Sequence, residues 1–132
     1  MVVMKGTSEC IDAVHYYVEL LKTKAGIYLP PPIIRFDLRG GVAGRAHYGK
    51  NVIQFNPVLL DQNPEVFVKQ TVGHEVAHLA AFVKSGGGIK PHGSEWARVM
   101  FSIGLPARRC HNYDTSVATG RRSVSLAREV LE

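Results

Sequence analysis

The segment His74-Glu75-Val76-Ala77-His78 constrains this chain more than any other part of its sequence. It lies inside an apolar run that is typical of a helix, and two histidines four residues apart project from one face of a helix, about one turn from each other. Their ring nitrogens can therefore bind one small cation, and Glu75 can reach a water on that cation. This spacing is typical of zinc hydrolases, most often peptidases. Five residues can also match by chance, so the rest of the chain has to support the interpretation.

Length and composition predict one soluble globular domain spanning 1–132. The chain of 132 residues is long enough for one hydrophobic core, and its 45% hydrophobic and 20% charged residues argue against a disordered or fibrous protein. The net charge of +5 favours an anionic partner such as nucleic acid, although solubility explains it equally well. There is no signal-peptide pattern and no apolar run of the roughly 20 residues that a membrane span needs. We therefore expect a cytoplasmic monomer with no membrane partner and with free thiols at Cys10 and Cys110.

Hydrophobic spacing and turn residues divide the chain into segments of different predicted structure. The expected elements are a helix over 8–24, a sheet over 33–56, the motif helix over 64–84, a loop and helix over 91–104, and a loop and tail over 105–132. Within the tail, a short helix is expected near 124–131. The order of elements predicts an α+β fold, in which a small sheet of about three strands packs against the motif helix and two or three further helices.

The predicted sheet begins after Pro30-Pro31-Pro32, which no helix can cross. Its strands are expected at 33–38, 44–48 and 51–55, with a hairpin-type turn at Gly49-Lys50-Asn51. Four basic residues accompany a single acidic residue in this region, so we expect the sheet to present a basic surface. The four are Arg35, Arg39, Arg45 and Lys50.

The motif helix is expected to start at Pro64, after the potential N-cap Asn63. Its predicted core face is the stripe Val68, Val72, Val76, Leu79 and Val83. At ~100° per residue, the two motif histidines lie roughly opposite Val76, so we expect them to be off the buried stripe. Gly73 costs ~1 kcal/mol of helix stability relative to alanine, which suggests that another backbone passes close to the site.

A catalytic zinc normally has three protein ligands and leaves its fourth position for water. The motif helix supplies two ligands, and the candidates for the third are His92, Glu95, His111 and His47. We favour His92, because a glycine-rich loop can reverse the chain before it and a helix follows it, and a neutral imidazole suits zinc. Glu95 would then orient His92 through its other ring nitrogen.

The expected chemistry is hydrolysis of a peptide bond with one zinc ion per chain. Glu75 would take a proton from the attacking water and deliver it to the leaving amine. A substrate strand could pair with a sheet edge, for which the strand at 51–55 is the candidate. Candidates for a second oxyanion-stabilising group are His111, Tyr113 and the Arg108-Arg109 pair. The two arginines are equally candidates for nucleic-acid contacts.

Further motifs accompany the histidines along most of the chain. They are Phe36-Asp37-Leu38-Arg39-Gly40, Ala43-Gly44-x-Ala46, Asn56-Pro57-x-Leu59-Leu60, Pro91-His92-Gly93-x-Glu95-Trp96 and Gly104-Leu105-Pro106-Ala107-Arg108-Arg109-Cys110-His111. Together they resemble the SprT family, to which the eukaryotic DNA–protein crosslink protease Spartan is related. The resemblance implies a zincin-like fold, zinc on His74, His78 and His92, and Glu75 as catalytic base. It also suggests a protein or peptide substrate, with DNA as a further partner in the Spartan branch.

One departure and one competing interpretation remain. SprT-like proteins commonly carry a cysteine-rich zinc ribbon after the loop that ends near Tyr113, whereas this sequence has no cysteine after Cys110. The competing interpretation is a nucleic-acid-binding module with a mainly structural zinc, which the positive charge and the sheet arginines favour. Glu75 discriminates between the two, because a structural site is closed by a fourth ligand and needs no general base.

Overall fold

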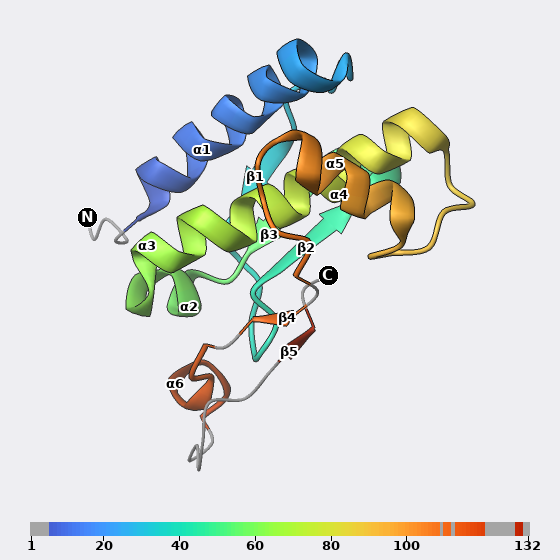
Figure 1. Cartoon of the computed structure of the whole chain (residues 1–132). Helices are drawn as coiled ribbons and strands as arrows, with labels where there is room; N and C mark the ends of the chain where they lie inside the picture. The colour runs from blue at the N-terminus through green and yellow to red at the C-terminus, as the bar shows by residue number, and fades with distance from the viewer. Residues whose placement is uncertain (1–5, 109, 112, 121–128, 131–132) are drawn as a thin grey trace.

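The computed structural model describes residues 6–108, 110–111, 113–120 and 129–130 (Figure 1). In chain order the elements are α1 (Thr7–Leu20), the π-helical turn η1 (Leu21–Ala25), β1 (Ile33–Arg35), β2 (Gly44–His47), the 3-10 turn η2 (Tyr48–Lys50), β3 (Val52–Phe55), α2 (Pro57–Gln62), α3 (Pro64–Val66), the π-helical turn η3 (Phe67–Thr71), α4 (Val72–Ser85), α5 (Ser94–Ser102), β4 (Cys110–His111), α6 (Ser116–Thr119) and β5 (Glu129–Val130). The predicted α+β fold, with a three-stranded sheet beside the motif helix, is confirmed.

The sheet has the strand order β1-β3-β2, with β1 parallel and β2 antiparallel to β3. The segment predicted as 51–55 is therefore the central strand, and our expectation that it offers an edge to a substrate is wrong. The edges are β1 and β2. The hairpin-type turn is confirmed, because η2 follows β2 and Asn51 adopts the left-handed conformation with φ 52°. The first strand is shorter than expected and ends at Arg35.

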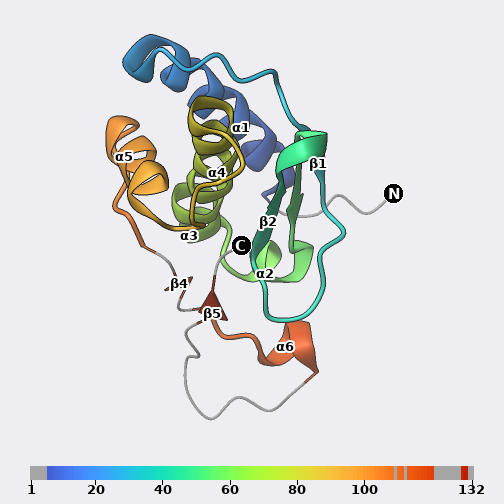
Figure 2. The ribbon, with the colours of Figure 1, turned by 90° about the vertical axis from the view of Figure 1, so that its right-hand side faces the viewer.

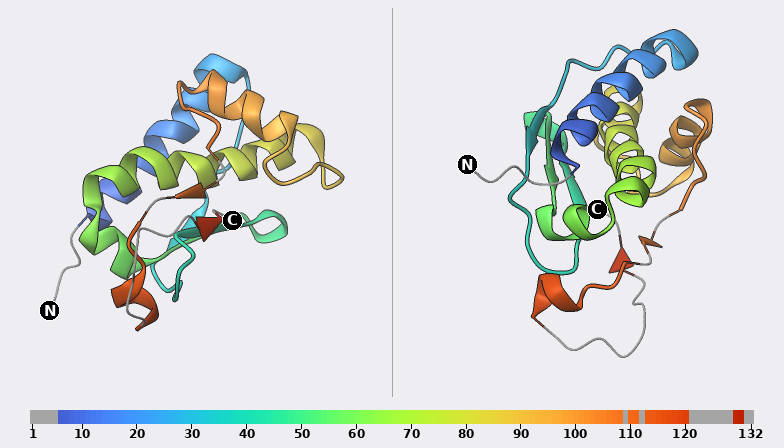
Figure 3. Two further views of the ribbon diagram at one scale, coloured as in Figure 1. Left: turned by 60° about the horizontal axis from the view of Figure 1, so that its bottom comes forward. Right: turned by 90° about the vertical axis from the view of Figure 1, so that its left-hand side faces the viewer.

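Helix α4 lies between the sheet and α5, and α1 packs along it (Figures 2 and 3). Every residue from Val72 to Ala81 is buried as a result. The predicted stripe is therefore wrong in two respects: Val83 is 49% exposed, whereas His74 and His78 are 1% and 2% exposed. A helix that is covered on several sides has no single core face, so the period of its apolar residues does not show which side chains are buried.

A side chain, rather than the backbone we expected, explains the glycine that precedes the motif. A Cβ atom on Gly73 would lie 2.1 Å from Cδ1 of Leu105 and 3.4 Å from the ring of Tyr17. Leu105 follows α5, and Tyr17 lies on α1. The missing side chain thus lets the loop after α5 and helix α1 both pack closely on α4.

Helix α2 is a short helix that the sequence did not predict. The side chain of Asn56 caps it, since Oδ1 accepts hydrogen bonds from the backbone of Val58 at 3.1 Å and Leu59 at 3.2 Å. Nδ2 of Asn56 donates to the carbonyls of Gly40 at 2.8 Å and Val42 at 3.0 Å. This one buried side chain therefore fixes the loop before β2 and the start of α2 together.

The described part of the tail differs from the expected helix near 124–131. Residues 129–130 form β5, which pairs antiparallel with β4, while positions 124–128 and 131 lie outside the described residues. Cys10 is buried with a free thiol, as expected. None of the helices in the described part of the chain is long and apolar enough to cross a membrane.

Candidate metal centre

Three histidine side chains converge on one point beside α4. Nε2 of His74 lies 2.8 Å from Nε2 of His92 and 3.2 Å from Nε2 of His78, and the last two atoms are 3.0 Å apart. His74 and His78 come from the first two turns of α4, and His92 comes from the loop before α5. Among the described residues, this is the one group of three or more side chains that could hold a metal ion.

The backbone at His92 is held in an uncommon conformation for a residue with a side chain. Its φ is 60°, in the left-handed region. The next residue, Gly93, donates its N–H to the carbonyl of Lys90 at 3.0 Å and then leads into α5. A tight turn anchored on a helix therefore directs the imidazole toward α4, as we expected when we favoured this histidine as third ligand.

The donor set fits a zinc ion. Imidazole nitrogens suit zinc, and a tetrahedral ion with Zn–N bonds of about 2.0–2.1 Å has ligand nitrogens about 3.3 Å apart. The three Nε2 atoms, 2.8 to 3.2 Å apart, need to open only slightly to accept it. The part of the chain that the structure describes supplies three nitrogens to this cluster, and zinc sites with three protein ligands normally keep the fourth position for water.

The outer nitrogens of His74 and His78 contact other parts of the protein. Nδ1 of His74 lies 3.1 Å from the carbonyl oxygen of Arg108, and Nδ1 of His78 lies 3.4 Å from the hydroxyl of Tyr48. A carbonyl oxygen only accepts, so His74 carries its proton on Nδ1 and leaves Nε2 free to bind a metal. Burial, and secondarily His92, lower the pKa of His78 to about 3, so the ring is neutral, as a metal ligand must be.

Trp96 on α5 packs against all three imidazoles. Its ring centroid lies 4.8, 5.6 and 4.9 Å from those of His74, His78 and His92. Its indole N–H donates to the carbonyl oxygen of His74 at 3.3 Å. Trp96 is buried, and nothing in the sequence indicated that it supports the histidine cluster.

Glu75 is fully buried between α4 and the sheet, with Oε2 4.0 Å from Nε2 of His74. It lies directly against Gly44 of β2. A Cβ atom on Gly44 would be 2.8 Å from Cγ, 3.1 Å from Cδ and 3.0 Å from Oε2 of the glutamate. The absence of a side chain at Gly44 therefore makes room for the carboxylate next to the three histidines.

The other candidates for metal binding lie outside the cluster. Nε2 of His47 contacts Oε1 of Gln54 at 2.6 Å. His111 donates from Nε2 to the carbonyl of Gly41 at 2.9 Å, and its Nδ1 accepts from the backbone N–H of Tyr113 at 3.1 Å. Both ring nitrogens of His111 therefore bind backbone groups, and this residue joins the C-terminal loop to the loop before β2.

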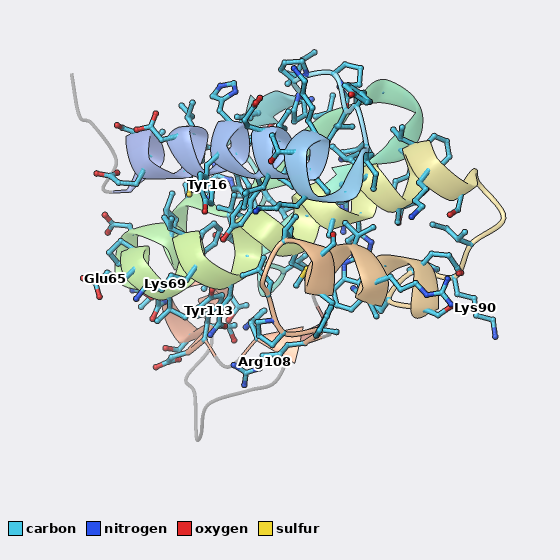
Figure 4. All side chains as sticks on the ribbon, turned by 45° about the horizontal axis from the view of Figure 1, so that its top comes forward. Tyr16, Glu65, Lys69, Lys90, Arg108 and Tyr113 are labelled. Carbon is cyan, nitrogen blue, oxygen red and sulfur yellow. The ribbon has the colours of Figure 1, made fainter. Side chains whose placement is uncertain are left out.

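Tyr113 and Glu95 have other partners than those expected from the sequence. The Tyr113 hydroxyl is 2.9 Å from Oγ1 of Thr71, and burial raises its pKa to about 12. Figure 4 places Tyr113 and Arg108 on the opposite side of α4 from α1. Glu95 accepts a hydrogen bond from the hydroxyl of Ser94 at 3.3 Å. These contacts give no support to Tyr113 as an oxyanion donor or to Glu95 as the partner of His92.

The predicted basic surface corresponds to the outer face of the sheet. Arg35 and Arg45 lie on either side of Gln54 in one row across the three strands. Arg35 also forms an ion pair with Asp37, which partly offsets the positive charge. Arg39 and Arg108 are exposed on loops, Lys50 is exposed at the end of η2, and Arg109 lies outside the described residues.

Comparisons with known proteins agree with these motifs. The model of the SprT-like family matches residues 12–116. Protein SprT of Pseudomonas syringae pv. tomato is 51% identical over 94 residues, which are 70% of this chain and 55% of that protein. Protein SprT of Pseudomonas fluorescens is 48% identical over 95 residues, 71% of this chain and 56% of that protein.

The chain spans about half the length of the curated relatives that it matches. No solved structure is significantly similar to it. Because the family match covers most of the sequence and includes all three clustered histidines and Glu75, the chain belongs to the SprT-like family.

Proposed function

We propose that this chain is a zinc-dependent endopeptidase. The observation that carries the proposal is the convergence of three histidine Nε2 atoms, with the carboxylate of Glu75 buried next to them. Such an arrangement suits a metal that stays open to water on one side, with a base beside it. The competing interpretation of a structural zinc is less well supported, because the cluster contains three ligands among the described residues and the adjacent carboxylate has no role in a closed site.

The proposed chemistry divides between the ion and the carboxylate. A bound zinc ion supplies Lewis acidity toward a water and toward a peptide carbonyl. Glu75 accepts the proton of the attacking water and then returns it to the leaving amine, which is general base followed by general acid catalysis. His74, His78 and His92 would hold the ion, and the contacts of His74 with Arg108 and of His78 with Tyr48 would keep those two rings oriented.

Strand β2 is the edge that we propose for the substrate. It packs against α4, and among the described residues β3 is its one neighbouring strand. The backbone of Asn56 donates to Ala43, and antiparallel pairing alternates along the strand, so the N–H and C=O groups of Gly44 and Ala46 point away from β3. An extended peptide that pairs with these groups would pass beside Glu75, because Gly44 lies against that side chain.

Replacement of Glu75 by glutamine tests this function. The variant keeps the size of the side chain and removes the base, so we expect it to bind zinc as the wild type does and to lose about 10²- to 10⁴-fold in cleavage rate. The assay follows cleavage of an unfolded, fluorescently labelled protein by the zinc-loaded chain, with a chelator added in parallel. Glu65→Gln, at an exposed position on α3, is the matched control. Equal cleavage by Glu75→Gln and wild type would refute the proposal.

Association with nucleic acid is a second candidate property. The arginines at Arg35 and Arg45 on the outer face of the sheet favour it. The proposed target class is then protein bound to DNA. Binding to DNA should weaken as salt rises, because phosphate contacts release counterions. The double variant Arg35→Ala/Arg45→Ala should reduce both the affinity and its salt dependence, and unchanged binding would exclude this surface. The cytoplasmic location and the monomeric state stay predictions.

A further inference from the structure

Tyr48 contacts the metal centre from a position that the sequence motifs do not include. It follows β2 directly and opens the turn η2. Its hydroxyl lies 3.4 Å from Nδ1 of His78, slightly longer than the roughly 2.7–3.2 Å of most N–H···O hydrogen bonds. Its ring stacks on Phe82 with a centroid distance of 5.2 Å and an interplanar angle of 7°. Since Phe82 lies one turn beyond His78 on α4, this stacking holds the hydroxyl over the outer edge of the His78 ring.

The direction of this contact follows from the geometry of the cluster. Nε2 of His78 faces the Nε2 atoms of His74 and His92. A neutral imidazole that binds a metal through Nε2 must carry its proton on Nδ1, and that N–H needs an acceptor. The Tyr48 hydroxyl is the acceptor that the structure places there.

The hydroxyl also keeps its own proton, which distinguishes Tyr48 from a carboxylate. A tyrosine hydroxyl is protonated at neutral pH, whereas a carboxylate is ionised. A neutral acceptor fixes the orientation of the ring without adding a negative charge to the site. The ligands therefore donate less electron density than they would with a carboxylate partner, which leaves more Lewis acidity on a bound ion.

We propose that Tyr48 is a positioning residue for the metal centre, whose hydroxyl accepts the Nδ1–H of His78 and directs Nε2 toward the ion. This inference rests on the proposed zinc site. His74 has the equivalent contact with the backbone carbonyl of Arg108, which substitution of a side chain does not remove. Removal of the Tyr48 hydroxyl therefore tests, by the change of a single group, how a ligand is oriented.

The first test compares the zinc affinities of wild type and Tyr48→Phe by competition with a chromogenic chelator. The variant keeps the ring and its stacking on Phe82 and removes the hydroxyl alone. We expect the dissociation constant for zinc to rise about 10- to 100-fold, as is typical when an outer partner of a ligand is lost. Tyr28→Phe, at a position that is 69% exposed, is the matched control and should leave the affinity unchanged. A Tyr48→Phe affinity within twofold of wild type would overturn the inference.

The second test uses long-range ¹H–¹⁵N spectra of the histidine rings, and its readout on the wild-type protein does not depend on how the variant folds. In the wild-type protein, with or without zinc, His78 should carry its proton on Nδ1 and show an NOE from that proton to the Tyr48 ring. In Tyr48→Phe, the His78 Nδ1 proton should exchange faster with water, while the His74 proton, held by Arg108, should not change. A His78 ring protonated on Nε2 in the zinc-free wild type would contradict the role of Tyr48. If the wild type instead has the expected tautomer but does not bind zinc, the proposed function fails and this contact stands.

Discussion

The contact between Gly44 and Glu75 makes the position of the catalytic base testable without changing the base itself. A Cβ atom on Gly44 would lie 2.8 Å from Cγ and 3.0 Å from Oε2 of Glu75. Carbon atoms in favourable contact are about 3.5–4.0 Å apart, so Gly44→Ala requires a shift of about 0.7–1.2 Å. Glu75 is fully buried and packed on its other sides, so either the carboxylate or strand β2 has to move.

We expect Gly44→Ala to lower kcat by about 100-fold. A misplacement of about 1 Å at a reacting group can reduce the rate by ~10², which is about 2.7 kcal/mol of transition-state stabilisation. The three histidines lie outside this contact, so zinc affinity should remain within a few-fold of wild type. The backbone of Gly44 is not in the left-handed region, so alanine introduces no backbone strain of its own.

The assay measures kcat on a labelled polypeptide, together with bound zinc and the thermal unfolding midpoint. Gly49→Ala is the matched control, because a Cβ atom there would meet nothing within 4 Å. Full activity of Gly44→Ala would show that the position of the Glu75 carboxylate does not limit catalysis, and would refute this reasoning. An equal loss in Gly49→Ala would show that the contact is not the cause.

Three further predictions concern the metal ligand, the packing of α4 and the buried acids. His92→Asn, which suits the left-handed backbone there, should fold normally and lose tight zinc binding in chelator competition; retained binding would exclude this ligand. Gly73→Ala should lower stability to denaturant by about 1–3 kcal/mol through its clash with Leu105, and Leu105→Ala in the same chain should recover most of the loss; a Gly73→Ala chain as stable as wild type would refute the clash. Burial raises the pKa of Cys10 and of Tyr113 to about 12. The unfolded state therefore releases these protons at a lower pH than the folded state does. The free energy of unfolding should have its full value below about pH 9 and should fall as pH rises toward about 12. Urea unfolding between pH 8 and 11 checks this, and Cys10→Ala should reduce the slope; a stability that does not depend on pH would contradict it.

The sequence predicted the parts of the site that are local along the chain. The spacing of His74 and His78 follows from one helical turn, and the turn before α5 made His92 the best candidate for the third ligand. The three-stranded sheet was visible because strands and glycine-containing turns alternate within a short segment. Each of these features depends on residues close together in sequence.

The contacts that complete the site join segments far apart in the chain. The spacing of hydrophobic residues along the sequence does not predict such contacts. Tyr48 reaches His78 across 30 positions, and the Arg108 carbonyl reaches His74 across 34. Gly44 was visible only as part of a motif, and its contact with Glu75 depends on how the sheet packs on α4. A sequence alone does not give the packing of a sheet on a helix.

Strand order was the other feature that local patterns could not supply. We expected an edge at 51–55, which is the last of the three strands in the chain. Strand β1, however, pairs with the side of β3 that faces away from β2, so β3 is the central strand. That pairing is parallel, so it depends on the path of the chain rather than on a turn. The candidate substrate edge consequently moved to β2, next to Glu75.

The proposed function depends most on three histidine nitrogens that share one ion with an open coordination position. Zinc K-edge X-ray absorption of the purified, zinc-loaded protein measures this directly. We predict one zinc per chain with three histidine nitrogens and one further light atom, at about 2.0–2.1 Å. A sulfur ligand at about 2.3 Å, or a fourth histidine, would describe a closed site and contradict the proposed hydrolase.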